Sequence, residues 1–200
     1  MQAQAAAADA ALYVKSCPGP SGGVIQTWAL VPNRVSVEEL ISSASSRVTA
    51  QVPDPIMTIS PDPWAGGTVN VGLWLAVEDP GQVSITASVG PVWATVTARY
   101  MSTSWDFGNG DSVECIGLGT PIDDLDTLEQ GPCGYTYRAP SAPEFTGTDD
   151  LAYHAAVTGH WSVTYETSAG GSGTLSPIDR STPFLYQVRE IQTLRVAEDG

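Results

Sequence analysis

Alternating apolar and polar residues run through most of the chain after residue 67 and predict a series of β-strands. In residues 68–77 the odd positions from Val69 to Val77 are apolar, which places Trp74 on the opposite face of the expected strand. Residues 151–168 continue the alternation, with Ala155, Val157, Trp161, Val163 and Tyr165 on one face. Residues 183–196 have the composition of a closing strand. The pattern predicts an all-β domain over residues 68–196, followed by a tail at 197–200.

The first 67 residues follow a different pattern and are expected to form an N-terminal segment with one strand and one helix. Residues 23–31 alternate well enough to be a short strand. In residues 36–49 the apolar positions recur with helical spacing, at Val37, Leu40, Ile41, Ala44 and Val48. Ser36 and Glu39 have the spacing of a capping box, which would start this helix. Residues 53–64 contain four prolines and predict an extended connector. We expect the helix that precedes this connector to pack against the β-domain.

The stretch WDFGNGD at residues 105–111 predicts a strand that runs into a tight turn. Asn109-Gly110 is a strong hairpin signal because both residues tolerate positive φ. Trp105 and Phe107 would share the buried face, and the turn is completed by Asp106, Gly108 and Asp111. Calcium binding by Asp106 and Asp111 is the alternative, but two carboxylates fall short of the six or more oxygens that calcium prefers. We therefore expect a structural hairpin and no metal.

Composition and charge exclude several classes of partner. The chain of 200 residues has a formal net charge of −14, with 22 acidic and 8 basic residues. Such a surface cannot release counterions from nucleic acid or bind anionic membranes. No run of 18 apolar residues is present, so no segment is expected to span a bilayer. The P-loop pattern G-x-x-x-x-G-K-[ST] is also missing, so we expect neither nucleotide binding nor a cofactor.

Residues with catalytic or metal-binding chemistry do not form a recognisable motif. An acidic run is expected to be a solvated loop rather than a cation site; it contains Asp123, Asp124, Asp126 and Glu129. His154 and His160 are predicted on one strand about 20 Å apart, too far to share a metal ion. Ser172 lies in GGSG and lacks the G-x-S-x-G pattern of an activated nucleophile. No catalytic residue is therefore assigned, and an enzyme with an unrecognised site remains an alternative.

Three of the six tryptophans form the candidate binding surface. Trp28, Trp64 and Trp74 lie in segments where an exposed ring is plausible, whereas Trp105 and Trp161 fit the core. Exposed tryptophan rings stack on sugar faces and anchor protein interfaces. The alternative is that these rings cover the helix or pack between the N-terminal segment and the β-domain. Whether they cluster in solvent distinguishes the two interpretations.

Two motifs resemble the PKD domain pattern. WDFGNGD, followed after a loop by GYTY at residues 134–137 and a long alternating strand, is similar to the W-D-F-G-D-G turn and H-T-Y strand of PKD domains. Asn109 stands where the pattern usually has Asp, and Gly134-Tyr135 replaces the usual residues before Thr136-Tyr137. The match covers about residues 68–196. The resemblance implies an immunoglobulin-like, PKD-type β-sandwich, here with a short N-terminal segment containing one α-helix.

The whole chain also resembles a mostly uncharacterised group of exported actinobacterial proteins. The shared outline includes CPG at residues 17–19, an EEL helix, C-x-G-x-G-T-P at 115–121, C-G-Y-x-Y at 133–137 and the ending VREIQTL. Some relatives carry an ATP/GTP-binding label, which the motifs of this chain do not support. The resemblance implies an extracytoplasmic location, secreted or at the cell surface. We expect the export or anchor segment to lie outside this chain.

The export that this resemblance implies bears on the three cysteines. Cys115 and Cys133 flank two strands that a sandwich would bring together, so we predict a disulfide between them. Cys17 is then left over. We expect it to pair with a cysteine upstream of Met1 in the full-length protein; a covalent dimer and a buried free thiol are the alternatives.

These observations together predict a non-catalytic structural or protein-binding module of the bacterial cell envelope. Its expected partner is another envelope or extracellular protein. The first alternative is a glycan-binding module that uses exposed tryptophans. The second alternative is the enzyme with an unrecognised site.

Overall fold

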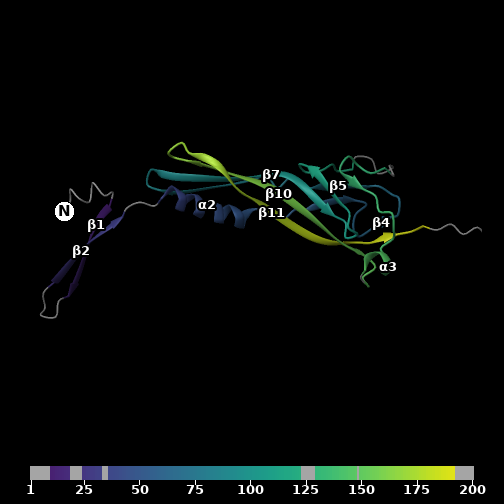
Figure 1. Cartoon of the computed structure of the whole chain (residues 1–200), viewed down its shortest axis with the longest axis horizontal. Coiled ribbons are helices and arrows are strands. Elements are labelled where there is room, and N and C mark those ends of the chain that lie inside the picture. The colour runs from purple at the N-terminus through teal and green to yellow at the C-terminus, as the bar shows by residue number, and fades with distance from the viewer. Residues whose placement is uncertain (1–9, 19–23, 33–35, 123–128, 148, 192–200) are drawn as a thin grey trace, which may run out of the picture.

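The computed structural model describes residues 10–18, 24–32, 36–122, 129–147 and 149–191. Its centre is a five-stranded antiparallel sheet (Figure 1). The order is β11 (Ser172–Tyr186), β10 (Tyr153–Thr167), β7 (Val92–Asp106) and β6 (Gln82–Val89), and β8 (Ser112–Ile116) also pairs with β7. Three of these strands are 15 residues long, so the sheet is much longer than it is wide.

One face of this sheet is covered by two different layers. Helix α2 (Val37–Gln51) packs on β6 and β7, and a three-stranded sheet packs near the other end of the long strands (Figure 1). The small sheet has the order β3 (Met57–Ser60), β5 (Leu73–Val77) and β9 (Gly134–Tyr135). Along β10 the buried residues Tyr153, Val157 and Trp161 all have odd numbers, so both layers lie on the same face. The fold is all-β and sandwich-like, as predicted; its immunoglobulin type stays a prediction.

Each layer has its own buried cluster. Beneath the small sheet the cluster is rich in aromatic rings and includes Trp105, Phe107, Tyr137, Tyr153 and Tyr186. Beneath the helix the cluster is built from small side chains around Trp161, and includes Ala44, Val48, Ala94 and Val96. Small residues let the helix approach the sheet closely, while rings fill the wider space between two sheets. The opposite face of the long sheet is lined by exposed and half-exposed residues, most of them polar.

A β-bulge at Met101 keeps both clusters on one face. The pairing of β7 with β10 moves from Trp161–Tyr100 to His160–Ser102, so Met101 is the extra residue. Before the bulge the even residues of β7 are buried, and after it the odd residues Thr103 and Trp105 are. The alternation pattern alone would have placed Trp105 on the face opposite to Ala98.

The helix begins as the sequence predicts. Ser36 accepts a hydrogen bond from the amide of Glu39, and the Glu39 carboxylate accepts one from the amide of Ser36. The structure ends the helix at Gln51, slightly beyond the expected residue 49. Buried residues Leu40, Ala44 and Val48 face the sheet, which confirms that the helix packs against the β-domain.

The N-terminal segment contains more strands than the one expected. β1 (Ala10–Pro18) and β2 (Val24–Pro32) pair as a separate two-stranded sheet, and β3 lies within the proline-rich connector. β1 was missed because its Ala-rich start lacks a clear alternation. β3 pairs with β5, and α2 packs on the long sheet, so the boundary at residue 67 does not separate two cores.

Two further expectations about strands are corrected. The closing strand expected at residues 183–196 is β11, which begins at Ser172 and ends at Tyr186. The strand predicted from Thr68 is divided into β4 (Gly67–Thr68) and β5, because Asn70 has φ +66° and turns the chain. β4 pairs in parallel with β12 (Val188–Arg189), just after the end of β11. The short helix α3 (Pro143–Thr146) lies between β9 and β10. The predicted tail at 197–200 lies outside the described residues.

Candidate functional site

The WDFGNGD segment forms a structural hairpin between β7 and β8, as predicted. Trp105 and Phe107 are both fully buried. Positive φ occurs at Gly108 and Gly110 and not at Asn109, so the expected Asn109-Gly110 turn is wrong in detail. Asn109 instead accepts a hydrogen bond from the amide of Asp111 through its side-chain oxygen, at 3.0 Å. A Cβ at Gly108 would lie 2.5 Å from the carbonyl oxygen of His154, which requires glycine there.

Tyr135 of the GYTY motif stabilises this turn through its ring and its hydroxyl group. Its ring stacks on Phe107 with centroids 3.8 Å apart, and its hydroxyl donates to the Asp111 carboxylate at 2.5 Å. Burial, followed by the hydrogen bond to Asp111, raises the pKa of Tyr135 to about 12. The Asp106 carboxylate accepts the amide of Gly108 at 2.8 Å. Both carboxylates therefore hold the turn together, which supports the structural interpretation over calcium binding.

Cys115 and Cys133 form a disulfide with Cα atoms 5.7 Å apart, as predicted. Cys115 lies in β8 of the long sheet, and Cys133 immediately precedes β9 of the small sheet. The bond therefore links the two layers. Cys17 pairs through its backbone with Ile25 in the β1–β2 hairpin. Its side chain lies outside the described residues, so its pairing with a cysteine upstream of Met1 stays a prediction.

The structure separates the three candidate tryptophans. Trp74 is half-buried, lies against Gly131, and donates from its ring nitrogen to the carbonyl of Glu129 at 2.9 Å. The Trp28 side chain lies outside the described residues. Trp64 is 97% exposed. The proposed surface of three rings is therefore reduced to one ring that the structure places in solvent.

Trp64 lies on a turn between β3 and β4 that several hydrogen bonds hold. Its amide donates to the Asp62 carboxylate at 2.8 Å, and the amides of Ala65 and Gly66 both donate to the Asp62 carbonyl. Gly67 then donates to the carbonyl of Gln187 at 2.8 Å, which attaches the turn to the strand beside it. A large apolar ring is thus presented to water on a fixed backbone, where its position costs little additional entropy on binding.

Apolar side chains continue from Trp64 along the end of β11. Two shallow hollows share Leu185, which is 53% exposed. We call their lining the Trp64 patch; it comprises Pro63, Trp64, Ala152, His154, Ala155, Ala156, Pro183, Phe184, Leu185 and Gln187. The hydrogen bond between His154 and Asp150, at 2.6 Å, contributes a polar rim. An apolar centre with a polar rim is the common anatomy of a protein interface.

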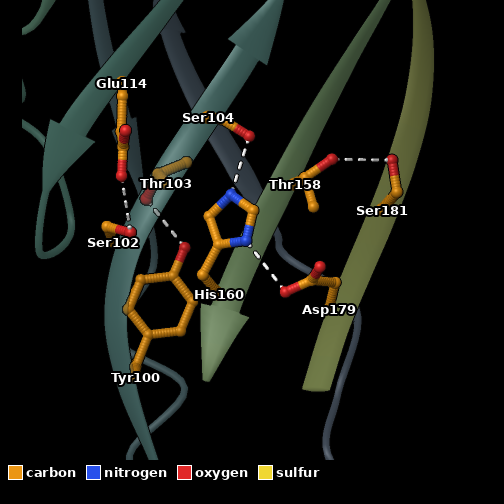
Figure 2. A network of polar contacts seen from close by, with 9 residues as sticks. All are labelled: Tyr100, Ser102, Thr103, Ser104, Glu114, Thr158, His160, Asp179 and Ser181. Atoms are coloured by element: carbon orange, nitrogen blue, oxygen red, sulfur yellow. Dashed lines mark hydrogen bonds and ion pairs between the residues drawn. The ribbon is translucent and has the colours of Figure 1, made fainter. Parts of the chain in front are cut away.

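A serine, a histidine and an aspartate meet on the uncovered face of the long sheet (Figure 2). The Ser104 hydroxyl lies 2.8 Å from Nε2 of His160, and Nδ1 of His160 lies 2.9 Å from the Asp179 carboxylate. The three residues come from β7, β10 and β11. Their connectivity matches the Ser-His-Asp arrangement of hydrolases, and the sequence analysis did not find it.

The surroundings of Ser104 do not suit acyl transfer. Ser104 is paired on both sides, with Thr158 of β10 and Glu114 of β8, so the ladders occupy the backbone amides around it. Acyl transfer needs free donors aimed at the developing oxyanion. The Asp179 side chain is 61% exposed, where water weakens its hold on the imidazole. We interpret the trio as one of several cross-strand polar contacts on this face, together with Ser102–Glu114 and Thr158–Ser181 (Figure 2).

The remaining candidates do not converge. His154 and His160 each have a separate aspartate partner, and Ser172 begins the exposed strand β11. Of the predicted acidic run, Asp123, Asp124 and Asp126 lie outside the described residues, and the Glu129 carbonyl accepts the hydrogen bond from Trp74. Within the part of the chain that the structure describes, no three His, Cys, Asp or Glu residues gather to hold a metal ion. No helix among the described residues is long and apolar enough to cross a membrane.

Comparison with known proteins finds no match to a family model, a curated protein or a solved structure. The resemblance to PKD domains and to exported actinobacterial proteins therefore stays a prediction. The assignment of function rests on the geometry of the sites described above.

Proposed function

We propose that this protein is a non-catalytic, extracytoplasmic binding module of the bacterial cell envelope that engages another protein through the Trp64 patch. The observation that carries the proposal is the 97% exposure of Trp64 on a turn fixed by Asp62, next to the exposed Leu185. Tryptophan is among the residues most enriched at interface hot spots. The disulfide between Cys115 and Cys133 supports an oxidising compartment.

A protein partner fits the Trp64 patch better than a glycan does. Sugar recognition combines an aromatic platform with several polar groups that bind the hydroxyls. Around Trp64 the lining is mostly aliphatic, and Gln187 and His154 are its polar members. A glycan array distinguishes the two kinds of partner directly. Saturable glycan binding that Trp64→Ala abolishes would show that the partner is a glycan and not a protein.

Replacing Trp64 with alanine is expected to abolish partner binding while changing the free energy of unfolding by less than about 0.5 kcal/mol. The measurement is affinity capture from an envelope extract of the source organism, with quantitative mass spectrometry. Trp93→Ala is the matched control, since Trp93 is a partly exposed tryptophan of β7 outside the patch. Equal capture by wild type and Trp64→Ala would contradict the proposed site.

The enzyme alternative is tested at Ser104. A fluorophosphonate probe labels serine nucleophiles that a histidine activates. We expect no labelling of Ser104, so wild type and Ser104→Ala should give the same signal. The physical reason is that the paired amides around Ser104 cannot stabilise the oxyanion. Stoichiometric labelling of Ser104, lost in His160→Ala, would show that the protein is a hydrolase.

A further inference from the structure

The two edges of the long sheet are built differently. The edge strand β11 contains Pro177 and Pro183 and the charged residues Asp179 and Arg180. Its side chains also hold the chain after α2: Arg180 donates to the carbonyls of Thr49 and Val52, and Thr182 donates to the carbonyl of Pro55 at 2.9 Å. Proline, charge and covering segments are the usual means of protecting an edge against pairing.

On the other edge, which β6 shares with β8, the β6 strand has neither proline nor charge, and in the part of the chain that the structure describes α2 packs on its face without a backbone hydrogen bond to its outer side. Its sequence QVSITASV contains no proline and no charged residue, although the chain carries a net charge of −14. Among the described residues β6 pairs only with β7, and no backbone hydrogen bond reaches its outer side. A regular, uncharged, eight-residue edge rich in β-branched residues is a template for pairing with another strand.

The register shows which groups this edge offers. β6 and β7 are joined by the two-residue turn Gly90-Pro91. Val89 and Val92 flank this turn and form the hydrogen-bonded pair that closes the hairpin. Antiparallel pairs alternate from there, so the backbone groups of the residues with odd numbers face β7. The outward groups belong to Gln82, Ser84, Thr86 and Ser88. The short hydroxyl contacts Ser84–Thr97, at 2.9 Å, and Thr86–Thr95, at 2.7 Å, agree with this, because side chains approach most closely in non-hydrogen-bonded pairs.

We propose that β6 pairs antiparallel with β6 of a second copy of this chain, about a twofold axis at Ile85. In that register Gln82 faces Ser88 of the second copy and Ser84 faces Thr86, so all the outward backbone groups of the strand are paired. Apolar residues also match, since Ile85 faces Ile85 and Val83 faces Ala87 on the side that carries α2. The strand is therefore complementary to itself, as an isologous interface requires. The result is one continuous ten-stranded sheet.

The uncharged edge lets two strongly acidic chains meet without opposing charges in the contact, and this gives the dimer a characteristic salt dependence. Two chains of net charge −14 repel each other at long range, while the paired strands contain no ion pair that salt could weaken. Dimerisation should therefore strengthen as NaCl rises from about 0.05 to 0.5 M, as the Debye length falls. An interface held by salt bridges would show the opposite trend.

Sedimentation equilibrium of the whole chain at high micromolar concentration is the first test, and the expected mass is twice that of one chain. Ser88→Pro removes an outward amide without touching the ladder to β7, and should raise the dissociation constant about tenfold because each copy loses a hydrogen bond. Ser88→Ala keeps the amide and should dimerise like wild type. A monomer under all conditions, or equal affinities for the two variants, would overturn the proposal.

A cysteine pair tests the register and does not depend on the proline variant. In a Cys17→Ser background, Ile85→Cys places two thiols opposite each other in a non-hydrogen-bonded pair, where the Cα separation of about 4.5 Å allows a disulfide. Val83→Cys is the control, because its counterpart lies about four residues away, roughly 13 Å along the strand. Mild oxidation should give a covalent dimer for Ile85→Cys only. Cross-linking of Val83→Cys in preference to Ile85→Cys, or of neither, would overturn the register.

Discussion

Replacing Trp161 with alanine is expected to lower the free energy of unfolding by about 3–5 kcal/mol, a large part of the stability of a domain this size. Trp161 is fully buried between α2 and the long sheet, and its ring meets Tyr100 edge to face at 5.2 Å. The substitution leaves a cavity in a cluster whose buried members include Ala44, Ala94 and Ala98, and these side chains are too short to fill it. Chemical denaturation followed by circular dichroism gives the value.

Trp161→Phe distinguishes how much the ring volume and the ring nitrogen of Trp161 each contribute to the free energy of unfolding. The Trp161 ring nitrogen is buried without a hydrogen-bond partner among the described residues, so removing this nitrogen breaks no hydrogen bond. We expect Trp161→Phe to cost much less than Trp161→Ala. Trp64→Ala, which removes an exposed ring of the same type, is the control for general effects of losing tryptophan. A cost below about 1 kcal/mol for Trp161→Ala would contradict the helix-covered core.

Removal of the disulfide is expected to lower the free energy of unfolding by about 3 kcal/mol. The two cysteines are 18 residues apart in sequence, and reduction releases a loop of this length in the unfolded chain. Both cysteines are also buried in the aromatic cluster, where the bond joins β8 to the start of β9. The measurement compares urea unfolding of wild type with and without reductant.

The variant Cys115→Ser/Cys133→Ser provides the control for this comparison. It should match reduced wild type closely and should not respond to reductant at all. If oxidised and reduced wild type unfold at the same urea concentration, the disulfide does not constrain this fold in the way described.

Features specified by neighbouring residues were predictable from the sequence. The capping box of Ser36 and Glu39 involves atoms within one turn, and the buried face of β10 follows from a period of two. The pairing of Cys115 with Cys133 was also predicted correctly. In each case the signal lies within the segment or follows from two strands packing together.

Features that depend on pairing register could not be predicted. The Met101 bulge moves the buried side of β7 from even to odd residues, and nothing in the local sequence marks it. Ser104 and His160 meet only because of that register, so the trio on the open face was missed. Asn70 likewise turns the chain through a left-handed conformation that an alternating pattern cannot reveal.

The candidate binding site was predicted in part. The sequence indicated Trp64 as a ring that could be exposed, but Trp74 could not be distinguished from it, since the half-buried position of Trp74 depends on Glu129 and Gly131. Leu185, the exposed apolar neighbour of Trp64, comes from β11, more than 100 residues later in the chain. Only the folded arrangement brings these residues into one patch.

Photo-cross-linking from Leu185 is the measurement that tests the central claim most directly. A benzoylphenylalanine at this position lies within the Trp64 patch, and the same residue at Ile116, which is 95% exposed on β8, is the control. Irradiation of cells that produce the full-length protein should give one protein adduct from Leu185, which is lost on adding Trp64→Ala and does not form from Ile116. Adducts that are identical from both positions, or that persist in Trp64→Ala, would contradict a protein-binding site at the Trp64 patch.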